Sequence, residues 1–212
     1  ATNARACVRM LDSDRSPAEP PSEQCADVLE RIGDQAERAG EVIRQIRRFV
    51  RKEEPERGPV RLSEMVDNVT RLVRHDAHRE GIQLRLQLAP EADRVLAQQI
   101  QIEQVLLNLV RNAIEAMSET PREQRILTIT STPADHGRVR LEVADTGPGL
   151  SPEVADDLFN PFVTTKTQGM GLGLSISSGI VEDHGGQLRV ESEPERGAVF
   201  WFTLPAHKPA LA

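Results

Sequence analysis

Asn108-Leu-Val-Arg-Asn112-Ala-Ile-Glu115-Ala-Met117 is the stretch that decides the fold, together with three shorter segments that follow it. These segments are Asp145-Thr-Gly147-Pro-Gly149, Phe159-Asn-Pro-Phe162-Val-Thr-Thr165-Lys166 and Gly169-Met-Gly171-Leu-Gly173-Leu-Ser175. The first stretch has the apolar spacing of a helix, the second segment follows an alternating strand pattern, and the last opens another helical pattern. Each segment alone is a common pattern, so the prediction depends on their order and on the elements that hold them.

The two asparagines of the first stretch are four residues apart, so both side chains leave the same side of the predicted helix. The opposite side is apolar, which would let the asparagines face a cleft. An Asn carbonyl oxygen is a neutral hard ligand that suits Mg²⁺. The alternative is a pair of solvent-facing asparagines, although Asn is a mediocre helix former.

Asp145 follows directly on a predicted strand and precedes Gly147 and Gly149. A carboxylate at a strand end can accept a hydrogen bond from an exocyclic amine. The glycines would let a planar ring approach the backbone closely. The same five residues also make a good turn with no further role, and that alternative stays open.

The glycine segment at residues 169–173 lacks the spacing of the dinucleotide fingerprint, and the chain contains no P-loop. The segment would instead place backbone N–H groups at the start of a helix, where these groups and the helix dipole favour binding of phosphate.

Together and in this order, the four segments resemble the nucleotide-binding boxes of sensor histidine kinases, which belong to the Bergerat-type ATPase/kinase superfamily. The resemblance implies ATP and Mg²⁺ as cofactors, with Asn112 as the metal ligand, Asn108 near the phosphates and Asp145 reading the adenine amino group. It also implies that residues 159–170 form a mobile lid over ATP, in which Lys166 faces the outer phosphates. The nucleotide-binding residues expected are Asn108, Asn112, Asp145, Gly147, Gly149, Phe162, Thr165, Lys166, Gly169, Gly171, Leu172, Gly173 and Leu174.

The residue one helical turn before Asn112 bears on the activity. Relatives of this fold that hydrolyse ATP carry a Glu there, whereas this chain has Asn108, which cannot act as a base. Glu103 is five residues from Asn108 and is expected to point elsewhere. The resemblance therefore implies a protein histidine kinase that transfers the γ-phosphoryl group of ATP, mostly by positioning and charge neutralisation. The alternatives are an ATPase of the same superfamily, an anti-sigma-type serine kinase, and a nucleotide-gated dimerisation module without transferase activity.

Residues 1–53 are expected to form an antiparallel helical hairpin, because two apolar helical patterns flank a turn with three prolines. The exposed apolar stripe predicts pairing with a second copy into a dimeric four-helix bundle. The hairpin resembles the dimerisation and phosphoacceptor domain of FixL/NtrB-type kinases, in which the acceptor histidine would lie before residue 1. The chain is therefore expected to bind ATP and Mg²⁺ without phosphorylating itself, and no catalytic residue is assigned in it. The resemblance further implies an upstream sensor domain and a response regulator receiver domain as partners.

The fold class expected is α+β, a two-layer α/β sandwich with a mixed sheet and helices on one face, preceded by the hairpin. The domains predicted are the hairpin at 1–53, a linker at 54–59, the ATP-binding domain at 60–206 and a tail at 207–212. Ser63 is expected to cap the first helix of the ATP-binding domain, which Gly81 would end. His184, at a predicted helix end, is expected to be structural. The predicted helices are 63–78, 98–117, 152–157 and 171–184, and the predicted strands are 84–88, 94–97, 126–131, 139–143, 187–193 and 198–204.

Composition limits the remaining choices. A formal net charge of -7 without a basic tail argues against nucleic acid as a partner. Cys7 and Cys25 are too few for a disulfide framework and suggest a reducing compartment. No apolar run reaches the ~20 residues that cross a bilayer. We therefore expect a cytoplasmic location for this chain, with a membrane anchor elsewhere in the parent protein left open.

Overall fold

The computed structural model of the chain describes residues 57–161, 163 and 171–207. The chain divides into two compact units, residues 1–54 and residues 55–212, and every described residue belongs to the second. The predicted helical hairpin, its dimer interface and nearly all of the tail lie outside the described residues. The following description concerns the second unit alone.

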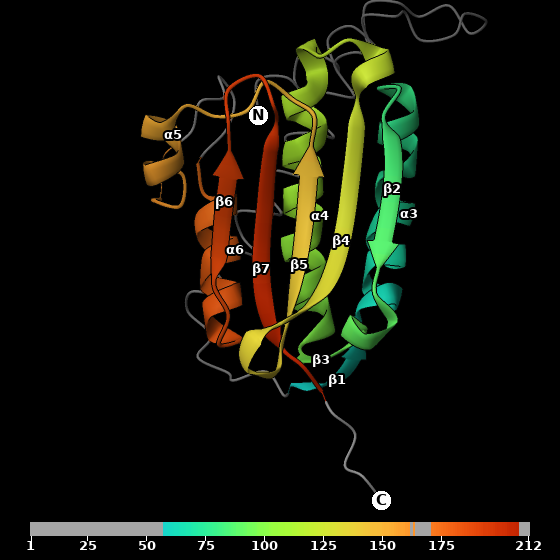
Figure 1. Ribbon diagram of the computed structural model, residues 1–212, viewed down its shortest axis with the longest axis vertical. Coiled ribbons are helices and arrows are strands. Elements are labelled where there is room, and N and C mark those ends of the chain that lie inside the picture. Colours follow the sequence, from blue (N-terminus) through green and yellow to red (C-terminus); the bar gives the residue numbers. More distant parts are fainter. Residues whose placement is uncertain (1–56, 162, 164–170, 208–212) are drawn as a thin grey trace, which may run out of the picture. The chain divides into compact units, whose positions relative to one another are not determined.

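A five-stranded mixed sheet forms one layer of this unit (Figure 1). Its strand order is β2-β4-β5-β7-β6, in which β2 runs parallel to β4 and every other neighbouring pair is antiparallel. The strands are β2 (Gln83–Leu88), β4 (Ile126–Ala134), β5 (Arg138–Asp145), β6 (Leu188–Ser192) and β7 (Ala198–Pro205).

Helices form the second layer, and Figure 1 shows the three long ones on the same face of the sheet. They are α3 (Leu62–Arg79), α4 (Gln99–Ala116) and α6 (Gly173–Asp183), while the short α5 (Pro152–Asp157) follows the loop after β5. Four single-turn helices occupy the connections: η1 (Pro90–Ala92), η2 (Met117–Glu119), η3 (Arg122–Gln124) and η4 (Asp135–Gly137). The expected two-layer α+β sandwich is confirmed.

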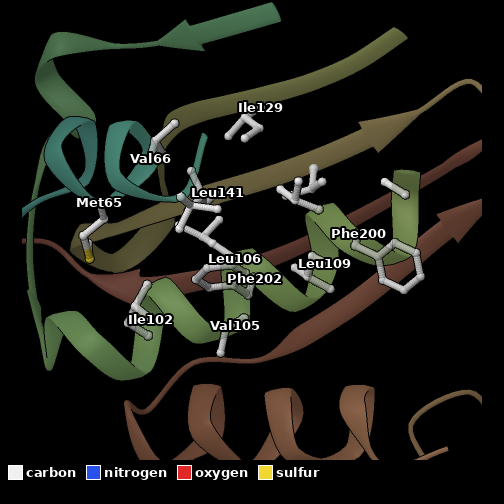
Figure 2. Close-up of a cluster of buried hydrophobic side chains, with 14 of the residues drawn as sticks. Met65, Val66, Ile102, Val105, Leu106, Leu109, Ile129, Leu141, Phe200 and Phe202 are labelled. Atoms are coloured by element: carbon white, nitrogen blue, oxygen red, sulfur yellow. The ribbon is translucent and has the colours of Figure 1, made fainter. Parts of the chain in front are cut away.

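The core lies between the two layers, because β5 and β7 alternate buried and half-buried residues along their whole length. Figure 2 shows how α3, α4 and the sheet contribute to one cluster. Burying a large apolar side chain of this kind contributes about 1.5–3 kcal/mol each. The labelled members of the cluster are Met65, Val66, Ile102, Val105, Leu106, Leu109, Ile129, Leu141, Phe200 and Phe202.

The start of α3 differs from the prediction. Ser63 does not cap the helix, because the N-cap position belongs to Arg61, which makes no capping side-chain bond. The cap comes instead from Asp93, whose Oδ1 accepts the N–H of Ser63 at 2.8 Å. The end of the helix is as expected: Gly81 follows the last turn with a φ of +68°, a conformation that glycine adopts without strain.

Two apolar side chains are less buried than their patterns predict. Leu86 alternates with polar residues in β2 yet is 48% exposed, because β2 is an edge strand that pairs only with β4. The apolar spacing at 3–4 residues predicts a buried stripe of α4 that includes Ala113 and Ala116, but Ala116 is exposed at the last turn of the helix. Ala113 is buried as predicted, and Ile114 is buried beside it.

The segment that leads into α3 forms a strand that no pattern predicts. β1 (Gly58–Arg61) pairs antiparallel with β3 (Arg94–Ala97) in a separate two-stranded sheet. Gly58 and Pro59, the last residues of the proposed linker, thus take part in regular structure. None of the helices in the described part of the chain has the length and apolar character needed to span a bilayer.

Candidate functional site

Three of the four predicted segments meet at one end of the sheet. In Figure 1 the arrowhead of β5 and the last turn of α4 lie at the same end, and α6 runs away from that end. Contacts between α4 and α6 and between α4 and β5 join these elements side by side. Half of the remaining segment, including Phe162, Thr165 and Lys166, lies outside the described residues, as does Gly169 of the glycine segment.

Asn108 lies in the interface between α4 and α6. Its Nδ2 donates to Oγ of Ser177, at 3.0 Å, and Ser177 is only 2% exposed. The first residue of α6, Gly173, approaches so closely that a Cβ on it would lie 2.7 Å from Oδ1 of Asn108. Asn108 therefore fixes the first turns of α6 against the asparagine helix.

Asn112 lies one turn further along α4, on the same side as Asn108 and half-buried. The spacing of four residues carries it toward the end of α4 that approaches β5. Its amide oxygen is a suitable ligand for a hard cation.

Asp145 is the last residue of β5 and is 7% exposed. Its Oδ1 accepts the N–H of Gly147 at 2.8 Å. Burial raises the pKa of the Asp145 carboxyl above its usual value, although the backbone N–H groups of Gly147 and Ala198 act in the opposite direction. A buried carboxylate with one oxygen held by the backbone is a preorganised acceptor for a donor on a ligand.

The turn after Asp145 rests on the end of α4. A Cβ on Gly147 would lie 3.3 Å from the carbonyl oxygen of Ala116 and 2.8 Å from Oδ1 of Asp145, so a side chain here would displace the carboxylate. Gly149 has a φ of +73°, and a Cβ there would overlap the carbonyl oxygen of Glu193 in the β6–β7 turn. These contacts place the carboxylate beside the helix that carries the asparagines.

The glycine segment is described from Gly171 onward. Gly171 has a φ of +65°, Leu172 is the N-cap residue of α6, and Gly173 begins the helix. Leu172, Gly173 and Leu174 are all half-buried. The helix thus starts two residues later than predicted, and its first turn lies against Asn108.

His184 is structural, as expected. It is 1% exposed, and its Nε2 accepts the N–H of Gln98 at 3.0 Å. Because Nε2 accepts, the proton of the neutral ring is on Nδ1, which lies 2.7 Å from the carbonyl oxygen of Ile180. This histidine fastens the end of α6 to the start of α4.

Sequence reasoning missed Ser177, Thr146 and Arg125 near this site. Ser177 shares the inward stripe of α6 with Ile180 and Val181, and a serine in an apolar stripe is a signal that could have indicated a buried polar contact. Arg125 precedes β4 with no local pattern around it, so only the structure identifies it.

Comparison with known proteins shows the family to which this chain is related. Residues 97–208 match the family model described as "Histidine kinase-, DNA gyrase B-, and HSP90-like ATPase". The "Sensor protein FixL" of Bradyrhizobium diazoefficiens is 44% identical over 189 residues, which are 89% of this chain and 37% of that protein. The chain therefore spans little more than a third of this relative.

Two solved structures are similar over nearly the whole chain. One is full-length ShkA in complex with AMPPNP, with 30% identity and a TM-score of 0.79, covering 99% of this chain and 44% of that one. The other is the histidine kinase ThkA in complex with the response regulator protein TrrA, with 29% identity and a TM-score of 0.71, covering 97% of this chain and 57% of that one.

The chain belongs to the family of histidine kinase-, DNA gyrase B- and HSP90-like ATPases. Within that family its relatives are sensor histidine kinases, and residues 97–208 carry an ATP-binding domain.

Proposed function

We propose that this chain is the ATP-binding catalytic part of a sensor histidine kinase, and that it transfers the γ-phosphoryl group of ATP to a histidine of the parent protein. One observation carries most of the support. The turn that holds the buried Asp145 rests on the end of α4, and the first turn of α6 packs against Asn108 on that same helix. A nucleotide could therefore contact all three segments at once.

We assign adenine recognition to Asp145. Its burial excludes water, and a carboxylate in that setting discriminates strongly between a ligand that donates a hydrogen bond and one that does not. An exocyclic amine donates, whereas the corresponding carbonyl of guanine or hypoxanthine does not. Gly147 and Gly149 serve the packing of this turn, because a Cβ on either would meet neighbouring protein atoms at Ala116 or Glu193.

We assign Mg²⁺ to Asn112. Among the described residues no group of three His, Cys, Asp or Glu side chains gathers to hold a metal. A site with one neutral amide oxygen fits Mg²⁺, which usually keeps several waters and takes its other ligands from substrate phosphates. When bound, the metal would neutralise charge on the outer phosphates during transfer.

The phosphates would lie at the start of α6, where the helix dipole favours negative charge. Asn108 supports this arrangement because it holds the first two turns of α6 through Gly173 and Ser177. The remaining nucleotide contacts stay predictions from the resemblance. They are those of Gly171, Leu172 and Leu174 and of the lid residues Phe162, Thr165, Lys166 and Gly169.

Transfer is favoured over hydrolysis because no carboxylate is available at the expected place of a general base. Asn108 occupies that place and is bonded to Ser177. Oε1 of Glu103, the nearest preceding acid on α4, accepts hydrogen bonds from Asn68 on α3, at 2.7 Å, and from Gln99, at 2.8 Å. This carboxylate is therefore engaged on the α3 side of α4.

We further propose that the parent protein acts as a homodimer through the hairpin of residues 1–53, in the cytoplasm, with an upstream sensor domain. A response regulator receiver domain would receive the phosphoryl group. The complex of ThkA with a response regulator protein supports the class of partner. The net charge of -7 continues to argue against nucleic acid.

Titration calorimetry with ADP, ATP and GTP, with and without Mg²⁺, tests the proposal on this chain. We expect a preference for adenine nucleotides, and tighter binding with Mg²⁺ that Asn112→Ala abolishes.

Asp145→Asn should weaken ADP binding about 10- to 100-fold, since it removes a hydrogen bond to a charged group. GTP binding as tight as ATP binding would contradict the role of Asp145. Steady release of phosphate without a protein acceptor would favour the ATPase alternative.

A further inference from the structure

Thr146 lies between Asp145 and Gly147 in the turn after β5, and its hydroxyl is hydrogen-bonded to the backbone that leads into β4. Oγ1 donates to the carbonyl oxygen of Gln124 at 2.6 Å and accepts the N–H of Ile126 at 2.9 Å. The last regular backbone pair between β4 and β5 joins Leu127 to Asp145. The side chain of Thr146 therefore continues the pairing at the point where the backbone of β5 leaves the sheet.

The backbone that Thr146 contacts is itself anchored by Arg125, which is 8% exposed. Its Nε donates to the carbonyl oxygen of Thr120 at 2.8 Å, and one terminal nitrogen donates to that of Ser118 at 2.6 Å. The other terminal nitrogen donates to the carbonyl oxygen of Glu80 at 2.8 Å. A guanidinium that satisfies carbonyls just beyond the ends of two helices is favourable, because those ends carry partial negative charge.

These contacts form a continuous connection from the end of α4 to the carboxylate. Arg125 holds residues 124–126 against η2, which follows α4 directly. Thr146 then joins residues 124–126 to the turn, and Met117 of η2 lies 3.6 Å from the same hydroxyl through its Sδ. The carboxylate of Asp145 is thereby fixed relative to the helix that carries Asn108 and Asn112.

We propose that Thr146 is a positioning residue for base recognition, and that Arg125 anchors the backbone to which the Thr146 hydroxyl is bound. The inference rests on the proposed function, since it concerns the role assigned to Asp145. Thr146 acts through Asp145: its two hydrogen bonds fix where β5 turns away from the sheet, and with it the direction of the carboxylate. Discrimination by a hydrogen bond depends on that direction, whereas binding of the phosphates does not.

The test compares Thr146→Val, which keeps the side-chain shape and removes both hydrogen bonds, with the control Thr146→Ser, which keeps the hydroxyl. Calorimetry with Mg²⁺ measures the dissociation constants for ADP, for IDP, which lacks the exocyclic amine, and for inorganic tripolyphosphate. We expect Thr146→Val to weaken ADP binding about tenfold, as for one lost hydrogen bond of intermediate strength, with IDP and tripolyphosphate unchanged. Thr146→Ser should bind all three ligands like the unmodified chain.

An undiminished preference for ADP over IDP in folded Thr146→Val would overturn the proposal. Equal loss of tripolyphosphate binding would also overturn it, because the hydroxyl would then support the whole pocket and not the base alone. Arg125→Lys provides a second variant, in case Thr146→Val does not fold. It keeps the charge, loses the planar fork and should reduce the same ADP preference by a smaller factor.

Asp145→Asn separates this proposal from the proposed function. If Asp145→Asn loses the ADP preference and Thr146→Val keeps it, only the positioning role fails. If Asp145→Asn itself keeps the preference, base recognition by this carboxylate fails and the role of Thr146 fails with it.

Discussion

Buried polar side chains join the elements of this domain to one another. Asp145 binds the backbone of its own turn, Ser177 connects α6 to Asn108, and His184 connects the end of α6 to the start of α4. Each is at most 7% exposed, so each would be costly without its partner. Asp145 differs from Ser177 and His184, because burial opposes the charged carboxylate that its proposed role in base recognition requires.

Asp145→Asn should therefore stabilise the nucleotide-free domain at neutral pH while it removes base recognition. The folded-state pKa of Asp145 is raised, so its contribution to stability is complete below the unfolded pKa and is lost as pH rises through the folded pKa. The asparagine keeps an oxygen for the N–H of Gly147 without the buried charge. We expect a gain on the order of 1 kcal/mol at pH 7.

Urea denaturation of both forms between pH 3 and pH 8 measures this difference, with Asp67→Asn as the control at an exposed carboxylate. The gain should shrink toward zero as the pH falls below the ordinary range of an aspartate pKa. A constant difference across the whole pH range would show that the charge of Asp145 is not its cause.

The sequence identifies some of these residues and not others. Asp145 and Asn112 stand in recognisable segments, and His184 stands at a predicted helix end. Ser177 differs from Ser175 and Ser178 in sharing the inward stripe of α6, but the stripe does not say that its partner is Asn108 of α4. The role of Arg125 likewise becomes visible only in the structure, where its guanidinium binds the nearby carbonyl groups of Ser118 and Thr120 together with that of Glu80, 45 residues away.

At the scale of elements, helix ends in this domain are completed by residues far away in the chain. The first turn of α3 depends on Asp93, whose carboxylate accepts the N–H of Ser63 and pairs with Nε of Arg61 at 2.8 Å. Ser63 itself is the cap that local sequence rules predict. The rules fail here because a carboxylate from the β3 side already occupies the capping position.

Asp93→Ala should lower the free energy of unfolding by about 1–2 kcal/mol, the usual cost of a lost cap. Burial raises the pKa of Asp93, but hydrogen bonds from Ser63 and Arg61 outweigh it, so the net shift is downward. Its stabilising contribution is present above the unfolded pKa and is lost as pH falls through the folded pKa. Thermal denaturation at pH 7 measures the loss, and Asp67→Ala is a matched control on α3, because its ion pair with Arg71 is exposed. Equal effects of the two substitutions would contradict the capping role.

The contact between α4 and α6 can be tested by a double-mutant cycle on Gly173 and Asn108. Gly173→Ala should destabilise the domain by about 1–3 kcal/mol, because the new Cβ would lie 2.7 Å from Oδ1 of Asn108. In an Asn108→Ala background the same substitution should be neutral or stabilising, since alanine is the better helix former. Denaturant titrations of the four forms measure the coupling. A cost for Gly173→Ala that is the same in both backgrounds would mean that Asn108 is not what restricts this glycine.

At the scale of the whole ATP-binding domain, the sequence predicts the layers well and the cross-connections poorly. Strand and helix periodicities predict the five strands of the main sheet and the helices on its face, because each element buries one side. The pairing of β1 with β3 was not predicted, because β1 has only four residues and begins with Gly58 and Pro59, so it carries no strand pattern. Three motif segments meet at one end of the sheet because of the order in which the strands and helices are connected. The motifs predict that order only through the family resemblance.

The central claim is that α4, the turn after β5 and the first turn of α6 form one site for an adenine nucleotide and its metal. A ¹H–¹⁵N NMR spectrum of the chain with ADP tests it most directly, with Mn²⁺ in place of Mg²⁺ as a paramagnetic probe for the same hard ligands. With Mn²⁺ we predict signal broadening centred on Asn112 and on the first turn of α6. With diamagnetic Mg²⁺ we predict chemical-shift changes at Asp145 and Gly147. Broadening centred away from Asn112, or an ADP complex that leaves the signals of Asp145 and Gly147 unchanged, would contradict it.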